Sequence, residues 1–364
     1  MNKKIVFLLI FAIFLALIVV AFLPFQKNKK TEKEISLNDK FGFLRSYTDL
    51  AQEQIEETGA GWIRLNFGYF VWGEIQKNKD APYDFSKTDE IVKNIQERNL
   101  KLLVTVFPYA DWDQKSYGEK CRVSDNDEML PRQKKGFKTE GLPYYRCNPQ
   151  DWQTYEKWLS SLVERYDKDG KNDMPDLKEP VLYYEIGNEP DLTKNKKNEP
   201  GIEFYLGTPE DYAMLLKQSY KTIKSANKDV QVLIAAMAGV QPNFQEYWKK
   251  VFSDKELANY FDIANIHCLS PPSGNLDDET GKNANDFNVS FYKNFLLSYG
   301  IKKPIWVTEA ENIQGNNQEE NFNRLKASVN NAFKNGAEKI FFTGASLSND
   351  PWRYTSDILI KEKH

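Results

Sequence analysis

The sequence has few residues of the types that usually build metal centres and nucleic-acid surfaces. Among 364 residues there are only 2 histidines and 3 cysteines, and no spacing among them matches a zinc site. Lysine and arginine number 49 against 52 aspartates and glutamates, which gives a net charge of −3 and no basic stripe. The composition therefore predicts a protein with no metal, no other cofactor and no nucleic-acid partner.

An apolar run distinguishes the amino terminus from the rest of the chain. Its 21 uncharged residues, Ile5–Phe25, are long enough to span a bilayer, and no good small-x-small cleavage site follows them. We therefore expect residues 1–26 to form a transmembrane signal anchor, with a cleaved signal peptide as the alternative. Residues 27–38, rich in Lys and Glu, are expected to form a tether, and residues 39–364 a single domain. This order predicts a membrane-anchored protein with an extracytoplasmic domain, or a secreted one if the first segment is cleaved.

The cysteines bear on the same question. Cys121 and Cys147 bracket a long polar excursion at 108–148, and in an oxidising compartment they could close it as a disulfide. Cys268 would then remain as a buried thiol. The alternative is three reduced cysteines in a protein that faces the cytoplasm.

From residue 41 onward, strand-like and helix-like segments alternate. Short runs rich in branched and aromatic residues predict eight strands, at 41–44, 62–67, 101–107, 181–187, 230–236, 261–266, 304–309 and 339–343. Helical spacing of apolar residues predicts intervening helices at 48–57, 86–98, 150–166, 209–226, 243–253, 287–299 and 318–334, with Ser86 as an N-cap. Such alternation selects a parallel sheet, and eight units favour a closed α/β barrel of the TIM (β/α)8 type. A doubly wound sheet is the alternative, but no Gly-x-Gly-x-x-Gly or phosphate loop follows the first strand.

The end of the fourth predicted strand carries an amide and a carboxylic acid. The run from Val181 breaks at Gly187, and Asn188, Glu189 and Pro190 follow. Because proline cannot donate to a sheet ladder, strand pairing should stop there. Asn188 and Glu189 should therefore lie at the carboxyl end of the strand, where parallel α/β folds place their chemistry.

The seventh predicted strand, 304–309, repeats this design and ends in Glu309. Two carboxylic acids at the ends of two parallel strands suggest glycoside hydrolysis. In that reaction one acid protonates the leaving oxygen, and the other attacks the sugar or activates water.

These residues resemble those of the clan A glycoside hydrolases, (β/α)8 barrels that include cellulases, mannanases and xylosidases. In that clan an Asn-Glu pair closes strand four and a second Glu closes strand seven, and here Asn188, Glu189 and Glu309 take these places. The resemblance covers roughly residues 40–350 and is supported by the independent strand count.

The resemblance implies a role for each matching residue. Glu189 would be the acid/base and Glu309 the nucleophile of a retaining mechanism, and Asn188 would bind the sugar 2-hydroxyl. Arg64 resembles the arginine that keeps the nucleophile ionised, but a barrel ion pair with Glu185 is the alternative. His267 would line the site, or it is only a satisfied polar group at the end of a strand. The clan's tyrosine near strand six, which binds the nucleophile, has no counterpart directly after His267.

Four aromatic residues fall in the predicted loops after strands two, three and eight: Trp72, Tyr109, Trp112 and Trp352. Such rings can stack on the apolar face of a sugar, or they can simply pack within the loops.

Together these features predict a monomeric, retaining glycoside hydrolase that cleaves β-glycosidic bonds in a polysaccharide or oligosaccharide. A non-catalytic carbohydrate-binding barrel is the principal alternative, and a barrel enzyme of other chemistry is a weaker one.

Overall fold

The computed structural model describes residues 38–45, 60–65, 67–130, 141–192, 201–268, 285–311 and 318–343. The predicted signal anchor, the tether up to residue 37, the predicted helix at 48–57 and Trp352 lie outside these residues. Within them, no helix is long and apolar enough to cross a membrane.

Eight strands form one parallel sheet, as the sequence predicts. They are β1 (Asn38–Arg45), β2 (Ala60–Leu65), β3 (Lys101–Val106), β4 (Tyr183–Ile186), β5 (Gln231–Ile234), β6 (Ala264–Cys268), β7 (Ile305–Ala310) and β8 (Ala337–Thr343). Their order in the sheet is β5-β4-β3-β2-β1-β8-β7-β6, and every adjacent pair is parallel. Two parallel bridges between the outer strands, Leu233 with Ile263 and Met237 with Ile266, bring the sheet round to a nearly closed barrel.

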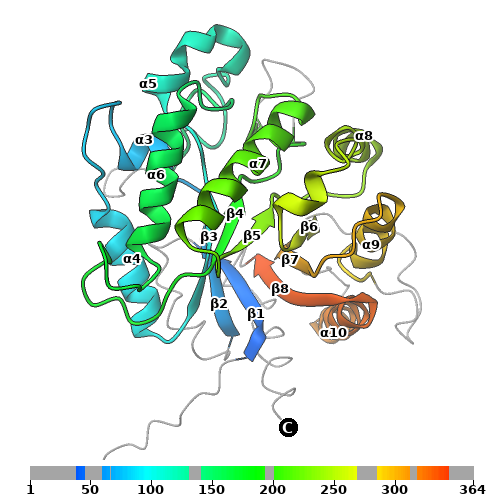
Figure 1. The fold of residues 1–364 in the computed structure, drawn as a ribbon. Coiled ribbons are helices and arrows are strands. Elements are labelled where there is room, and N and C mark those ends of the chain that lie inside the picture. The colour runs from blue at the N-terminus through cyan, green and yellow to red at the C-terminus, as the bar shows by residue number, and fades with distance from the viewer. Residues whose placement is uncertain are drawn as a thin grey trace, which may run out of the picture. The chain divides into compact units, whose positions relative to one another are not determined.

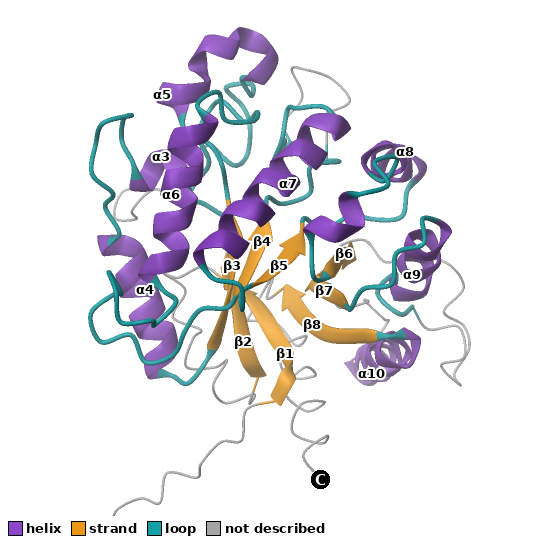
Figure 2. Ribbon diagram, in the orientation of Figure 1, coloured by secondary structure: helices purple, strands orange, loops and turns teal. Residues whose placement is uncertain are grey.

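Helices cover the outside of this barrel (Figures 1 and 2). The long ones are α4 (Ser86–Glu97), α6 (Trp152–Arg165), α7 (Pro209–Ala226), α8 (Pro242–Val251), α9 (Val289–Ser298) and α10 (Gln318–Asn335). Helix α7 shows why they begin where they do: the Thr208 side chain and Asp211 form a reciprocal capping box, and Pro209 occupies the first turn. The apolar faces of these helices pack on outward-facing strand residues such as Val104 and Ile186.

The barrel interior changes from aromatic to polar along the strands. One inner layer consists of six buried apolar residues, Trp62, Leu103, Leu233, Ile263, Trp306 and Phe341. The indole rings of Trp62 and Trp306 meet edge to face at 5.4 Å. Gly42 is required beside them, because a Cβ atom there would come within 2.5 Å of the Phe341 ring. Aromatic side chains thus fill the barrel interior at the layer of Trp62 and Trp306.

Two residues further along the strands, the inward-facing positions are polar. Because side chains alternate between faces with a period of two, Arg64 follows Trp62, Asn265 follows Ile263 and Thr308 follows Trp306 on the same inner face. These three residues are fully buried. The sequence thus places a layer of hydrogen-bonding groups between the aromatic layer and the carboxyl ends of the strands.

Three details differ from the sequence-based expectations. Phe85 occupies the N-cap position of helix α4 without a side-chain capping bond, and Ser86, predicted as the cap, is the first helical residue. The excursion predicted as a plain loop contains α5 (Asp111–Gln114) and a 3-10 helix, η1 (Lys115–Cys121). Two further short helices, α3 (Trp72–Ile75) and the 3-10 helix η2 (Leu257–Tyr260), were also not predicted, because segments of four residues carry no readable periodicity.

Of the two alternatives that the sequence left open for Cys121 and Cys147, the disulfide is present, with a Cα–Cα distance of 5.5 Å. It crosslinks two segments of the excursion, and beside it the backbone nitrogen of Arg146 donates to the carbonyl of Cys121 at 2.9 Å. Cys268 is a buried free thiol, as expected.

Candidate active site

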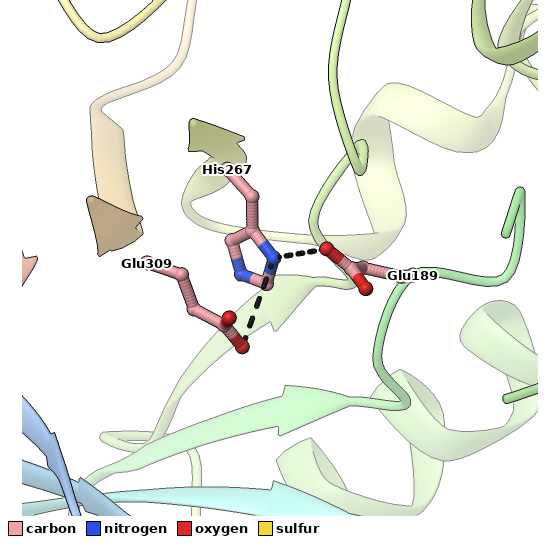
Figure 3. A group of neighbouring side chains, drawn as sticks. All are labelled: Glu189, His267 and Glu309. Atoms are coloured by element: carbon pink, nitrogen blue, oxygen red, sulfur yellow. Dashed lines mark hydrogen bonds and ion pairs between the residues drawn. The ribbon is translucent and has the colours of Figure 1, made fainter. Parts of the chain in front are cut away.

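Glu189 and Glu309 meet at the carboxyl ends of β4 and β7. One carboxylate oxygen of each lies within 4.8 Å of the other and of a ring nitrogen of His267, and all three residues are buried (Figure 3). Glu189 follows Gly187, whose φ is 77°, and itself has φ 35°, in the left-handed region that non-glycine residues seldom adopt. This turn directs the Glu189 side chain toward Glu309, and such local strain is typical of functional sites.

An irregularity in β7 turns Glu309 toward the barrel interior, where Thr308 already lies. Val307 pairs with Ile266, whereas Glu309 pairs with His267, so Thr308 is an extra residue on β7. Consecutive strand residues normally point to opposite faces, but a bulge re-aims a side chain. Thr308 and Glu309 therefore both contact groups inside the barrel.

Arg64 links the two acidic strands. Its Nη1 donates to Glu309 Oε1 at 2.7 Å, its Nε donates to Glu185 Oε2 at 2.8 Å, and its Nη2 donates to Asn188 Oδ1 at 2.6 Å. Arg64 therefore makes both contacts that the sequence suggested. Its guanidinium donates to the candidate nucleophile Glu309 and also forms an ion pair with Glu185 inside the barrel. Thr105 and Asn265 also donate to Glu185, at 2.7 and 2.6 Å, so this carboxylate is fully bonded to protein groups.

Asn188 is oriented by Arg64 and keeps a free donor. Because its Oδ1 accepts from Arg64, its Nδ2 is the remaining group; among the described residues this buried nitrogen makes no hydrogen bond of regular geometry, although it lies near enough to the Glu189 carboxyl group to lower the pKa of that group. A buried donor without a partner is costly unless a ligand satisfies it. Asn188 can therefore donate to a hydroxyl or another acceptor bound between the two acids.

The two acids differ in their electrostatic surroundings. Burial is the main cause that raises the pKa of Glu189 to about 8; the Arg64 guanidinium opposes the rise, the Glu185 carboxylate adds to it, and the Asn188 side chain opposes it. Burial also raises the pKa of Glu309, but the Arg64 guanidinium opposes that rise. Since Arg64 bonds directly to Glu309 and not to Glu189, Glu189 is the acid that holds its proton at neutral pH.

His267 lies between the two acids. Its Nδ1 is 2.7 Å from Glu189 Oε1 and 3.7 Å from Glu309 Oε1, and its Nε2 is 2.9 Å from Thr308 Oγ1. Burial lowers the pKa of His267 to about 4, so the ring is neutral near pH 7. Both interpretations of His267 from the sequence agree with the structure. The ring lies between the two acids, and each of its nitrogens is within hydrogen-bond distance of a partner.

The donor set of this cluster does not favour a metal ion. Glu189, His267 and Glu309 are close enough together to act as ligands. However, Glu309 already accepts from the Arg64 guanidinium, whose positive charge would repel a cation at the same oxygen. We assign no metal to these residues.

Sequence reasoning missed Asp191. This buried carboxylate accepts from the Trp248 indole nitrogen at 2.9 Å and from the backbone nitrogen of Ala238 at 3.0 Å. It thereby ties the loop after β4 to the segment after β5 and fixes the turn that carries Glu189. Burial, with Glu189 next in importance, raises the pKa of Asp191 well above its usual range. Its position two residues after Glu189 was the only signal in the sequence.

Two of the aromatic residues predicted to stack on a sugar, Trp72 and Tyr109, are buried in the core. Trp72 and Tyr109 are 0% and 1% exposed, and each polar atom is bonded within the protein, to Gln76 and to the Phe204 carbonyl. Their rings are core packing, which corrects the expectation that they stack on a sugar. Trp112 is partly exposed and lines a surface hollow together with Trp152, Lys79, Asp113, Gln150 and Asp151.

A pocket opens directly beside Glu189. Besides Glu189 it is lined by Leu192, Ala238, Gly239, Val240, Gln241, Phe244, Cys268 and Asn288. They lie at the carboxyl end of β6 or in the segments after β4, β5 and β6, and Glu189 lines the pocket whereas Glu309 does not. It is largely apolar, with a carboxylic acid in its wall.

The barrel is similar to solved structures of glycoside hydrolases. It resembles a glucosidase from Croceicoccus marinus with a TM-score of 0.55 and 14% sequence identity, over 89% of this chain and 63% of that one. For a family 39 glycoside hydrolase from the gut symbiont Bacteroides cellulosilyticus, the TM-score is 0.55 at 13% identity, over 89% and 64% of the two chains. For an endo-1,4-beta-mannanase from Rhizomucor miehei, the TM-score is 0.50 at 12% identity, over 89% and 95%.

At 12–14% sequence identity these likenesses establish the fold alone, which is a (β/α)8 barrel. The chain spans less than two thirds of the length of the first two enzymes. No protein-family model matches the sequence, and no curated protein matches it.

Proposed function

We propose that this protein is a retaining glycoside hydrolase that cleaves β-glycosidic bonds, with Glu189 as the acid/base and Glu309 as the nucleophile. The observation that carries the proposal is the approach of the two buried carboxyl groups to within 4.8 Å. In retaining enzymes the two groups lie about 5–5.5 Å apart, whereas inverting enzymes leave about 6.5–9.5 Å for a water molecule. The spacing supports direct attack by one carboxylate on the sugar.

The electrostatics support the assignment of the two roles. A nucleophile must be ionised, and Glu309 accepts from Arg64 at 2.7 Å. A general acid must be protonated at working pH, and the pKa of Glu189 is raised to about 8. Glu309 would attack the anomeric carbon while Glu189 protonates the departing oxygen. Glu189 would then remove a proton from the water that hydrolyses the glycosyl-enzyme bond.

The pocket beside Glu189 supports a place for the leaving group. A general acid has to contact the oxygen that it protonates, so the space next to Glu189 and away from Glu309 is where the leaving group would lie. Its largely apolar lining, with the Phe244 ring, suits the face of a sugar or an aryl group. The free Nδ2 of Asn188 would bind a hydroxyl of the sugar that Glu309 attacks.

Kinetics with azide test the two roles separately. With an activated aryl β-glycoside, Glu309→Ala should abolish turnover in plain buffer. Azide should rescue Glu189→Ala by giving a β-glycosyl azide, because the glycosyl-enzyme still forms without the acid. It should rescue Glu309→Gln much less. Equal activity of the wild type and Glu309→Ala would reject the assignment. No turnover by either protein would instead favour a carbohydrate-binding barrel without catalysis.

We also propose that the domain is displayed outside the cytoplasm on a membrane anchor formed by residues 1–26. The apolar run of the sequence and the disulfide between Cys121 and Cys147 support this location, because disulfides persist in oxidising compartments. Membrane fractionation with external protease tests it. We expect the protein in the membrane fraction, with its domain cleaved by protease added to intact cells. A domain that is protected from this protease would contradict the proposal.

A further inference from the structure

A chain of polar groups runs from the ion pair of Arg64 to His267, and each link has a fixed direction. It begins at Asn265, whose Nδ2 donates to Glu185 Oε1 at 2.6 Å. A carboxylate that also accepts from Arg64 can only accept, so the amide nitrogen of Asn265 must face it. The amide oxygen of Asn265 therefore points the other way, toward Thr308.

The next link fixes the hydroxyl proton of Thr308. Thr308 Oγ1 lies 2.8 Å from Asn265 Oδ1 and 2.9 Å from His267 Nε2. The Asn265 oxygen can only accept, so the single hydroxyl proton of Thr308 is used in that bond. The Thr308 oxygen must then accept from His267, which places a proton on Nε2 of the ring.

The last link follows from the neutral state of His267. A buried imidazole with a proton on Nε2 carries a lone pair on Nδ1, and this atom lies 2.7 Å from Glu189 Oε1. Two acceptors cannot face each other at that distance. Glu189 must therefore donate its carboxylic proton to His267. The alternative, an imidazolium facing an ionised Glu189, would separate two charges in a fully buried place.

We propose that Asn265 and Thr308 are positioning residues that hold His267 in the Nε2-protonated tautomer, so that Nδ1 keeps the acid proton on Glu189. This inference rests on the proposed role of Glu189 as the acid/base. In the first step the proton would pass from Glu189 to the glycosidic oxygen as the bond from that oxygen to the anomeric carbon breaks and the bond from Glu309 forms.

The tautomer has a second consequence for the later step. Once Glu189 has lost its proton, its new charge faces the Nδ1 lone pair, which disfavours the ionised form. Glu189 is therefore a stronger base toward the water whose oxygen bonds to the anomeric carbon, and it recovers its proton from that water. The other charged groups around this pair are Arg64 and Glu309, with Glu185 behind them. Asp191 on the same loop as Glu189 adds a further carboxyl group.

The tautomer can be read directly by nitrogen NMR of histidine. The chain has only two histidines, and His364→Ala would leave the signals of His267 alone. We expect a protonated Nε2 and an unprotonated Nδ1 throughout pH 5.5–7.5. A ring protonated at both nitrogens, or at Nδ1 alone, would overturn the proposal. This measurement needs no substrate, so it separates failure of the tautomer from failure of the proposed activity.

The matched variants Thr308→Val and Thr308→Ser test the consequence for the reaction. Valine keeps the shape but removes the acceptor for Nε2, so the ring can move its proton to Nδ1 and donate to ionised Glu189. The pKa of Glu189 should then fall, and the basic limb of kcat/KM should move down by about one pH unit or more. Thr308→Ser keeps the hydroxyl and should restore the wild-type limb.

Leaving-group dependence distinguishes this role from a structural one. In Thr308→Val, kcat/KM should fall more for alkyl glycosides, which need a proton, than for activated aryl glycosides. A structural defect would lower both alike. A folded Thr308→Val enzyme with an unmoved basic limb and uniform loss would overturn the proposal.

Discussion

Arg64 and Glu309 are 245 residues apart in the sequence, and their side chains bond at 2.7 Å in the buried interior of the barrel. The same guanidinium holds Glu185 and the amide oxygen of Asn188. One planar, permanently charged group therefore favours the ionised form of the candidate nucleophile, Glu309, and orients Asn188, the residue before the candidate acid. Several consequences of this arrangement can be measured.

Replacement of Arg64 should affect both activity and stability. In Arg64→Met, the buried Glu309 and Glu185 lose their cation. We expect kcat/KM to fall on the order of a hundredfold or more, and the free energy of unfolding to fall by about 3–5 kcal/mol. Arg64→Lys should retain only part of the activity, because an ammonium cannot form the three-way fork.

The double variant Arg64→Met with Glu185→Gln serves as the control for folding. Neutralising Glu185 should restore much of the stability and little of the activity, since Glu309 still lacks its partner. Activity that returns together with stability would show that Arg64 acts only on the fold. Denaturant titration and steady-state kinetics supply the two readouts.

The pH profile of kcat/KM should have its basic limb near pH 8. Activity should fall as pH rises through the pKa of Glu189, about 8, because the acid then loses its proton. The acidic limb should lie above the usual carboxyl range, since the pKa of Glu309 is also raised and a protonated nucleophile is inactive. Glu189→Gln should lose the basic limb with an activated aryl glycoside. A basic limb that persists in this variant would assign it to another group.

The same shift makes Glu189 a source of pH-dependent instability. Its pKa is about 8 in the folded protein against 4.5 ordinarily, so the folded state binds the extra proton between these values. The free energy of unfolding therefore declines, from this group, as pH rises through that window. Glu189→Gln should be more stable than the wild type, by on the order of a few kcal/mol at pH 8 and little at pH 4.

Glu90→Gln, at an exposed position of α4, is the matched control and should leave the pH dependence of stability unchanged.

His267 contributes to the pH dependence of stability with the opposite sign and in a different pH window. Its pKa is lowered from 6.5 to about 4, so its contribution to stability is lost as pH falls through that range. Urea titrations of the variants from pH 4 to 8 would measure these differences. A constant gain for Glu189→Gln at all pH values would contradict the raised pKa.

Loss of the disulfide should lower stability through the unfolded state. Cys121 and Cys147 are 26 residues apart, and closing a loop of that length contributes about 2–4 kcal/mol in the chain-entropy model. The double variant Cys121→Ser with Cys147→Ser should show this loss in denaturant titration, and reductant should have no further effect on it. If reductant leaves the stability of the wild type unchanged, the excursion does not depend on its crosslink.

Much of the barrel could be predicted from sequence because its strands are short, apolar and regularly spaced. Runs such as 101–107 can be read locally, and the breaks at Gly187 and Pro190 mark the end of β4. The proximity of Glu189 and Glu309 could be predicted because each residue ends or directly follows such a run. Both lie at the carboxyl ends of parallel strands, which meet at one end of a barrel.

The remaining site residues depend on relations that one strand does not reveal. Thr308 faces the interior by regular alternation, but Glu309 points there beside it only because β7 is irregular at His267, and a bulge has no signature in the residues of a single strand. Asn265 reads as one polar residue in an apolar run until the partner Glu185 is known. The sequence did not predict that Trp72 and Tyr109 are buried, because an aromatic ring can serve equally well to stack on a sugar or to pack in a core.

The anomeric form of the first product tests the central claim most directly. Proton NMR would follow hydrolysis by the wild type and by Glu309→Gln, across a panel of aryl β-glycosides and β-linked oligosaccharides. Two carboxylates acting by double displacement predict that the β-anomer forms first, and that the Glu309→Gln variant forms none. A first product in the α form, or no hydrolysis by the wild type beyond that of the variant on any member of the panel, would contradict the account.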